Sequence, residues 1–221
     1  MIDAGRIALI FDMDNTLIGS QIDFPAIRRA LIALLRAAGA VQEPDDALMR
    51  RAIAQLVAIG AGHDRTHSTA LISGMWQVIE AHEAQGLRGA LPLDDAGDVL
   101  AALRARGFRI AILTNNGRGA ALVALRAAEL HDSAEVLIAR DDVRALKPAG
   151  DGVAEAARRL GDVERLYVIG DSWIDGAAAA ASGARFIAYR RPAAELRDRG
   201  VRPWRTITHL AELLDLDLTQ P

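Results

Sequence analysis

The sequence predicts an α/β protein with a doubly wound, parallel, five-stranded sheet and an inserted all-helical cap domain. Three observations lead to this prediction. Short apolar runs alternate with helical patterns along most of the chain, which is typical of a parallel sheet covered by helices. Four of the five apolar runs lack an alternating polar face, as strands buried on both sides do. One long stretch after the first run contains only helical patterns.

The five apolar runs are the expected strands. They are Ile7–Phe11, Arg109–Leu113, Glu135–Ile138, Leu166–Ile169 and Arg185–Tyr189. Helices are expected between and after them, over residues 94–106, 119–129, 149–160, 174–181 and 207–214. Gly107 and Gly183 follow two of these patterns, where glycine commonly ends a helix.

Residues 19–89 are expected to form a helical cap domain, and residues 1–18 and 90–221 the α/β core domain. The insert is within the usual size range of a small domain. Its helical patterns cover residues 26–38, 45–59 and 66–85. A proline begins the first two patterns and a glycine follows each of the three, which is the usual asymmetry of helix ends.

Composition narrows the classes of function. The chain has 51% hydrophobic and 25% charged residues and a net charge of -3, so we expect a soluble globular protein without a nucleic-acid or membrane partner. It has no cysteine, which excludes disulfides, thiolate metal sites and a cysteine nucleophile. We expect no targeting signal and a cytoplasmic location. The oligomeric state is left open.

Lysine usage singles out one residue. The 26 basic residues are 25 arginines and one lysine, Lys147, in the segment ALKP after the third expected strand. An ammonium is a compact point charge, whereas a guanidinium is a wide planar fork. Lys147 is therefore a candidate for chemistry that requires an ammonium, although most lysines are solvated surface residues.

Two carboxylates follow the first expected strand in the segment FDMDNTL. Asp12 and Asp14 stand just past its carboxyl end, where open α/β sheets bind ligands. One carboxylate could attack phosphorus while the other moves protons to and from the ester oxygen. The alternative is a simple turn that leaves the strand, since Asp, Asn and Thr favour turns.

Polar side chains follow two further strands. Thr114, Asn115 and Asn116, in LTNN, could bind phosphate oxygens, or they could form an ordinary polar loop. Asp171 and Asp175, in IGDSWIDGA, are four residues apart and could hold Mg²⁺. The alternative for this pair is a helix start enriched in acidic residues.

These motifs in this order resemble the haloacid dehalogenase superfamily, in the branch similar to phosphoglycolate phosphatase. The resemblance covers essentially the whole chain, including the helical insert and the block GDSWIDGAAAAASGA. It implies a magnesium-dependent phosphatase that hydrolyses a small phosphorylated metabolite through a phospho-aspartate intermediate. It also implies that the first and fourth strands lie side by side.

The resemblance implies a role for each motif. Asp12 would be the nucleophile and a metal ligand, and Asp14 the general acid and base with its backbone carbonyl on the metal. Thr114 and Lys147 would bind the phosphoryl group, with Asn115 beside them. Asp171 and Asp175 would complete the magnesium site. Asn15 and Gly19 depart from the residues most frequent in the family, which leaves the substrate subfamily open.

Other functions remain as alternatives. A phosphomutase shares this core, and a non-catalytic phosphate-binding module is the alternative outside enzymes, although such a module would be expected to have lost Asp12 or Asp14. A haloacid dehalogenase has no need of Asp14 or the Asp171–Asp175 pair. A phosphonatase needs a lysine in the insert, and Lys147 is the only lysine.

Overall fold

The computed structural model describes residues 2–67 and 69–220, which form two compact units. An α/β unit contains the described residues up to Ser20 and those from Gly89 onward, and a helical unit spans Gln21–Arg88. Among the described residues, no helix combines the length and apolar character needed to cross a bilayer.

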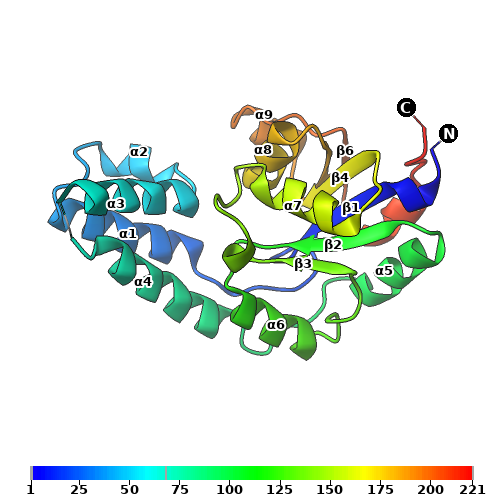
Figure 1. Ribbon diagram of the computed structural model, residues 1–221, viewed down its shortest axis with the longest axis horizontal. Helices are drawn as coiled ribbons and strands as arrows, with labels where there is room; N and C mark the ends of the chain where they lie inside the picture. Colours follow the sequence, from blue (N-terminus) through cyan, green and yellow to red (C-terminus); the bar gives the residue numbers. More distant parts are fainter. Residues whose placement is uncertain (1, 68, 221) are drawn as a thin grey trace. The chain divides into compact units, whose positions relative to one another are not determined.

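A six-stranded parallel sheet forms the centre of the α/β unit, in the order β3-β2-β1-β4-β5-β6 (Figure 1). The strands are β1 (Ile7–Asp12), β2 (Arg109–Leu113), β3 (Val136–Ile138), β4 (Arg165–Gly170), β5 (Arg185–Tyr189) and β6 (Arg205–Ile207). The predicted fold class is confirmed.

The prediction of five strands is wrong, because β6 is a sixth. It pairs with β5 through Ile187 opposite Arg205 and Tyr189 opposite Ile207. Only Ile207 of its three residues is buried, since β6 is an edge strand. A three-residue strand with two exposed polar residues does not produce an apolar run, so periodicity could not identify it.

The strand order reverses beside β1. The chain passes from β1 to β2 and β3 on one side, and later to β4, β5 and β6 on the other. All six residues of β1 are buried, as expected of a strand covered on both faces. Its carboxyl end therefore lies next to that of β4, at the point where such sheets bind ligands.

Helices cover both faces of this sheet. The helices of the unit are α5 (Ala96–Ala105), α6 (Arg118–Ala127), α7 (Asp151–Leu160), α8 (Trp173–Ala181) and α9 (Ala193–Arg197), with short 3-10 helices η1 (Ala4–Arg6), η2 (Arg140–Asp142) and η3 (Leu210–Leu214). Apolar residues of α7 and α8 form one core with β1, β2 and β4. In Figure 1, α5 and α6 lie on the opposite side of the sheet.

The expected helix over residues 207–214 is wrong. Ile207 ends β6, and only Leu210–Leu214 is helical, as the 3-10 helix η3. The Glu212 carboxylate accepts hydrogen bonds from the backbone N–H groups of Thr208 and His209, at 2.7 and 2.8 Å. These bonds fix a turn between the strand and the 3-10 helix.

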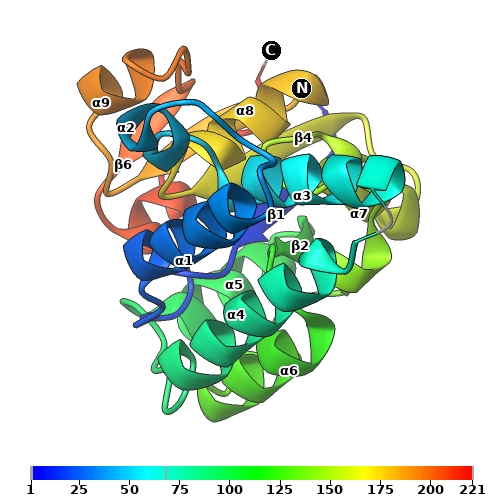
Figure 2. The ribbon, with the colours of Figure 1, turned by 90° about the vertical axis from the view of Figure 1, so that its left-hand side faces the viewer.

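The described residues of the helical unit form four helices rather than three. They are α1 (Phe24–Ala37), α2 (Asp45–Met49), α3 (Ile53–His67) and α4 (Leu71–Gly86), and α1, α3 and α4 pack on one another (Figure 2). The expected helix over 45–59 is divided between α2 and α3. The Gln55 side chain accepts a hydrogen bond from the Ala52 backbone N–H at 2.9 Å, which stabilises the start of α3.

Gly60 lies inside α3 and does not end a helix. A Cβ atom at Gly60 would lie 2.4 Å from the Met75 sulfur, so glycine leaves room for the Met75 side chain of α4 against α3. The third expected helix, over 66–85, begins later, at Leu71, where Asp64 accepts hydrogen bonds from the Leu71 and Ile72 backbone N–H groups. Ser68, within that expected helix, lies outside the described residues.

Candidate active site

Four segments bring polar side chains together at the carboxyl end of the sheet. Asp12 is the last residue of β1, Thr114 follows β2, and Asp171 follows β4. Lys147 comes from the loop between η2 and α7. These elements meet here because parallel strands present their carboxyl ends at one edge.

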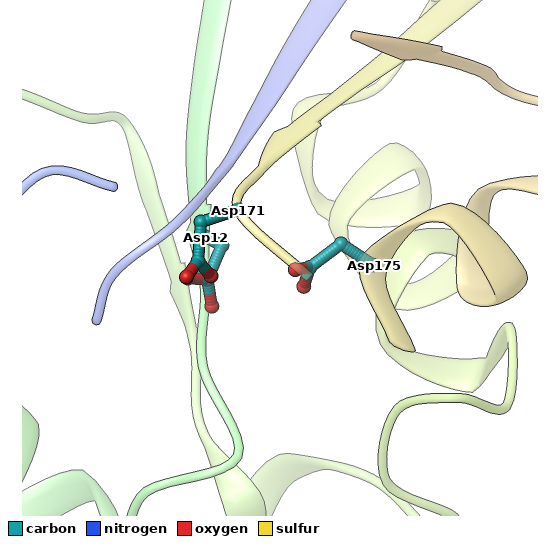
Figure 3. A group of neighbouring side chains, drawn as sticks. All are labelled: Asp12, Asp171 and Asp175. Atoms are coloured by element: carbon teal, nitrogen blue, oxygen red, sulfur yellow. The ribbon is translucent and has the colours of Figure 1, made fainter. Parts of the chain in front are cut away.

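Three carboxylates form a cluster at this edge (Figure 3). Oxygen atoms of Asp12, Asp171 and Asp175 all lie within 4.8 Å of one another. Asp175, in the first turn of α8, accepts hydrogen bonds from the Ser172 backbone N–H at 3.1 Å and from the Ser172 hydroxyl. The same carboxylate therefore caps α8 and belongs to the cluster.

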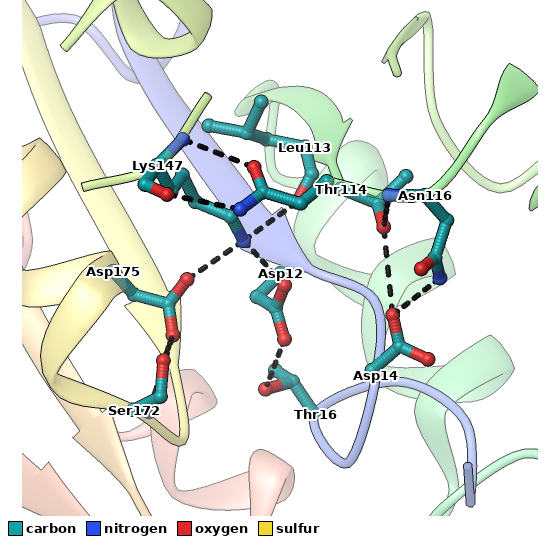
Figure 4. A network of polar contacts seen from close by, with 10 residues as sticks. Asp12, Asp14, Thr16, Leu113, Thr114, Asn116, Lys147, Ser172 and Asp175 are labelled. Carbon is teal, nitrogen blue, oxygen red and sulfur yellow. Dashed lines mark hydrogen bonds and ion pairs between the residues drawn. The ribbon is translucent and has the colours of Figure 1, made fainter. Parts of the chain in front are cut away.

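The Lys147 ammonium lies between two of these carboxylates (Figure 4). Its Nζ atom is 2.5 Å from Asp12 Oδ1 and 2.7 Å from Asp175 Oδ1, and it donates a third hydrogen bond to the Leu113 carbonyl at 3.1 Å. Lys147 is only 3% exposed. The three donors of the ammonium thus have three acceptors.

Asn115 holds the backbone of Lys147. Its side-chain amide donates to the Lys147 carbonyl and accepts from the Lys147 N–H, each at 3.0 Å. In this structure, the side chain of Asn115, predicted as a substrate ligand, joins the loop after β2 to the loop that carries Lys147.

Asp14 lies in a tight turn after β1. Asn15 in this turn has a left-handed backbone, with φ of 58°, and its N–H donates to the Ile18 carbonyl at 2.8 Å. The Asp14 carboxylate accepts hydrogen bonds from Asn116 Nδ2 at 2.6 Å and from the Thr114 hydroxyl at 3.5 Å (Figure 4). The motif is therefore a turn that also carries two buried carboxylates, Asp12 and Asp14.

Burial and mutual repulsion perturb the carboxylates. Burial raises the pKa of Asp12 well above its usual value, Lys147 opposes this, and Asp175 and Asp171 add to it. Burial also raises the pKa of Asp14, against hydrogen bonding from Ser20 and the charge of Lys147. The pKa of Asp171 rises to about 6 because of burial and the neighbouring charge of Asp175, with Arg191 acting in the opposite direction.

The pKa of Lys147 remains above its ordinary value. Burial alone would lower it, but the charges of Asp12 and Asp175 outweigh that effect. Lys147 is therefore a permanent cation at neutral pH.

The donor set fits a hard divalent cation. Asp12, Asp171 and Asp175 offer carboxylate oxygens at close range, and Asp14 adds a further buried acid. Lys147 neutralises only part of this charge. Oxygen ligands of this kind suit Mg²⁺, whose charge would offset the burial and the mutual repulsion that raise carboxylate pKa values in this cluster.

The sequence does not predict two contributing residues, Ser172 and Arg191. It predicts Asn116 as a possible ligand for phosphate oxygens, but not as a partner of the Asp14 carboxylate. Ser172 could have been found from the Ser-x-x-Asp spacing that is typical of a capping box. Arg191 donates from Nε to the Asp171 carbonyl at 2.9 Å and lies 3.6 Å from its carboxylate, and no local sequence signal predicts this contact.

Comparisons with known proteins point to one family. The haloacid dehalogenase-like hydrolase family matches residues 8–183. A phosphoglycolate phosphatase of Cereibacter sphaeroides is 30% identical over 221 residues, which cover 94% of this chain and 96% of the relative. The plasmid phosphoglycolate phosphatase of Cupriavidus necator is 29% identical over 186 residues, which cover 80% and 77% of the two chains.

A solved structure has the same fold. A HAD family hydrolase from Deinococcus radiodurans R1, determined with bound phosphate and sodium, is 27% identical to this chain with a TM-score of 0.60. The match covers 96% of this chain and 94% of that one.

Fold and site together define a doubly wound α/β protein with a carboxylate cluster at the carboxyl end of its parallel sheet. The chain belongs to the haloacid dehalogenase-like hydrolase family. The resemblance that the sequence motifs carried is thereby confirmed. The predicted enzyme class, a phosphatase of this family, is likewise confirmed by relatives that carry this name.

Proposed function

We propose that the protein is a magnesium-dependent phosphatase that hydrolyses a small phosphomonoester through a phospho-aspartate intermediate on Asp12. The position of the Asp12 carboxylate carries this proposal. One oxygen contacts Lys147, the other accepts a hydrogen bond from the Thr16 hydroxyl at 3.2 Å, and Asp171 and Asp175 lie beside it. A carboxylate held in this way is oriented for attack on a phosphorus atom.

The first step transfers the phosphoryl group to the protein. An Asp12 oxygen forms a bond to phosphorus while the bond between phosphorus and the ester oxygen breaks. Asp14 gives its proton to the departing oxygen, which leaves as the alcohol. The raised pKa of Asp14 supports this role, because the carboxyl group must hold a proton before it can donate one.

The second step releases inorganic phosphate. The Asp14 carboxylate, now deprotonated, accepts a proton from a water molecule as that water attacks phosphorus. The bond between phosphorus and the Asp12 oxygen breaks, which restores both carboxyl groups. One residue thus serves as acid in the first step and base in the second.

The positive charges of Mg²⁺ and of the Lys147 ammonium would offset the negative charge of the phosphoryl group. We propose that Asp12, Asp171, Asp175 and the Asp14 backbone carbonyl hold Mg²⁺, which would neutralise charge on the transferring phosphoryl oxygens. Thr114 and Lys147 would bind the same oxygens, and Asn115 would support Lys147 through its backbone.

The substrate class follows from the relatives. Because several relatives are named phosphoglycolate phosphatase, we propose a small phosphorylated metabolite and place phosphoglycolate first among those to be tested. We also propose that the helical unit, Gln21–Arg88, serves as the cap domain that the sequence analysis expects at 19–89. A cytoplasmic location remains a prediction from the cysteine-free sequence.

Phosphate release tests the proposal. Phosphoglycolate, sugar phosphates and nucleoside monophosphates are incubated with the wild-type protein in Mg²⁺ or in EDTA, and with Asp12→Asn in Mg²⁺. We expect release that requires Mg²⁺ and is lost in Asp12→Asn. Release that persists in Asp12→Asn would exclude Asp12 as the nucleophile. A folded wild-type protein that releases no phosphate would favour the phosphomutase or the non-catalytic binding module.

A further inference from the structure

We propose that Asn116 is a positioning residue that fixes the Asp14 carboxylate for proton transfer to the leaving oxygen. This inference rests on the proposed function and deepens it. Its evidence is a side-chain hydrogen bond between two buried groups that are 102 positions apart in the chain.

The hydrogen bond from Asn116 to Asp14 is much shorter than that from the Thr114 hydroxyl. The Asn116 Nδ2 atom is 2.6 Å from Asp14 Oδ2, compared with 3.5 Å for the Thr114 hydroxyl. Asn116 is 4% exposed and Asp14 is 9% exposed, so solvent competes little for this bond. A buried hydrogen bond to a carboxyl group is worth more than an exposed one, and without it Oδ2 keeps the longer bond from the Thr114 hydroxyl.

The backbone of Asn116 is itself held in place. Its N–H donates to the Thr114 hydroxyl at 3.1 Å, and its carbonyl accepts from the Arg140 N–H at 2.9 Å. The amide group therefore projects from a fixed loop, and it limits the orientation of the Asp14 side chain.

The direction of the bond selects one carboxyl oxygen. An amide N–H group can only donate, and it donates to Oδ2, as the Thr114 hydroxyl also does. In a protonated carboxyl group, the carbonyl oxygen is the better acceptor. Both of these donors favour Oδ2 as the carbonyl oxygen, and Oδ1, which has no hydrogen-bond partner among the described residues, is left to carry the proton that Asp14 transfers.

The leaving group provides a specific test. An alkoxide is a poor leaving group and needs protonation in the transition state, whereas p-nitrophenolate leaves without it. General acid catalysis typically contributes about 10²–10⁴ in rate. Removal of the side chain that orients the general acid should therefore slow the hydrolysis of alkyl esters and largely spare that of p-nitrophenyl phosphate.

The experiment compares the wild type with Asn116→Ala and Asn116→Leu. The value of kcat/KM is measured for phosphoglycolate, or for whichever alkyl phosphate the wild type hydrolyses best, and for p-nitrophenyl phosphate. This parameter covers only the steps up to formation of the phosphoenzyme, so any effect on its hydrolysis does not interfere. We expect a loss of about 10- to 100-fold for the alkyl ester and of less than about threefold for p-nitrophenyl phosphate.

A second background tests whether Asn116 acts through Asp14. In Asp14→Asn, which has no acid to orient, Asn116→Ala should not change the ratio of the two kcat/KM values further. Equal losses for both esters, or no loss for either, would overturn the inference. Activity on p-nitrophenyl phosphate also reports that the variants are folded. If the wild type hydrolyses neither ester, the proposed function fails instead, so the two failures are distinguishable.

Discussion

Lys147 shows how one side chain is matched to its site. Its ammonium has three hydrogen-bond donors and three short contacts, to Asp12, Asp175 and the Leu113 carbonyl. The residue is almost completely buried, so a larger head group would have to displace one of the carboxylates. A guanidinium carries the same charge but spreads it over a planar fork. We infer that shape as well as charge accounts for a lysine here in an arginine-rich chain.

The Lys147→Arg variant should therefore lose phosphatase activity although the substitution conserves the positive charge. We expect kcat for phosphate release to fall by about 10²-fold or more, because Asp12 and Asp175 cannot keep their positions around a guanidinium. Arg158→Lys is the matched control, since Arg158 is a 70% exposed side chain in an ion pair with Glu155. It should retain wild-type activity. An active Lys147→Arg variant would show that charge alone is required.

Removal of the Lys147 charge should also reduce stability. Lys147→Met leaves two buried carboxylates without their shared cation, and the loss of one partner from a buried ion pair typically costs about 3–5 kcal/mol. Urea denaturation in EDTA should detect this change in the free energy of unfolding. An unchanged midpoint would contradict the contacts described for Lys147.

The sequence predicts the site residues unevenly. Asp12, Asp14 and Lys147 stand out because they follow buried strands or because a lone lysine is conspicuous. The side chains of Asn115 and Asn116 are adjacent amides in one loop, yet one contacts the Lys147 backbone and the other the Asp14 carboxylate. Which of two neighbouring side chains points to which partner depends on the backbone of the loop, and residue types alone do not determine it.

At the scale of elements, the junction between β4 and α8 sets the position of Asp175. Gly170 ends the strand, and the first turn of α8 passes close to it. A Cβ atom at Gly170 would lie 2.5 Å from the Asp175 Cγ atom and 2.6 Å from Oδ2. Glycine is thus required for the carboxylate to reach both Ser172 and Lys147.

Gly170→Ala should displace Asp175 and weaken the metal site. We expect the Mg²⁺ concentration for half-maximal activity to rise by about 10-fold or more, in the range typical of disturbed support around a metal site. Titration of Mg²⁺ in a phosphate-release assay measures this change. Gly119→Ala is the control, because Gly119 is exposed in α6 and a Cβ atom there meets nothing within 4 Å. Equal effects of the two substitutions would contradict the steric argument.

Periodicity missed two features of the fold, each for its own physical reason. β6 has two exposed residues and gains its strand conformation from pairing with β5, which only the folded sheet provides. The break between α2 and α3 lies in the segment around Arg51, where neither proline nor glycine marks it. The central strands, by contrast, are buried on both faces and produce apolar runs whose bounds lie within one residue of the observed strands.

At the scale of the whole molecule, the site makes the free energy of unfolding depend on pH and on metal binding. The pKa of Asp171 is about 6 in the folded protein and about 3.9 in an unfolded chain. Between these values the folded state binds more protons than the unfolded state. The metal-free protein should therefore lose stability as pH rises from about 4 to about 6. The raised pKa values of Asp12 and Asp14 act in the same direction.

Magnesium should reverse this loss, and only above that window. At pH 7.5 the carboxylates are ionised and Mg²⁺ binding should raise Tm clearly, whereas at pH 5 protons compete and the increase should be small. Thermal unfolding with Mg²⁺ and with EDTA at both pH values measures the effect. Asp171→Asn should reduce both the pH dependence and the Mg²⁺ effect. Equal Mg²⁺ shifts at pH 5 and pH 7.5 would contradict this linkage.

The most direct test of the mechanism is to locate the phosphoryl group on the protein. The wild type is mixed with its best substrate and Mg²⁺, quenched in acid within milliseconds, digested and analysed by mass spectrometry. We predict the mass of one added phosphoryl group on the peptide that contains Asp12, and conversion of Asp12 to homoserine when the quenched protein is treated with borohydride. Asp12→Asn should show neither. A phosphoryl group on another residue, or none at any time during turnover, would contradict the phospho-aspartate mechanism.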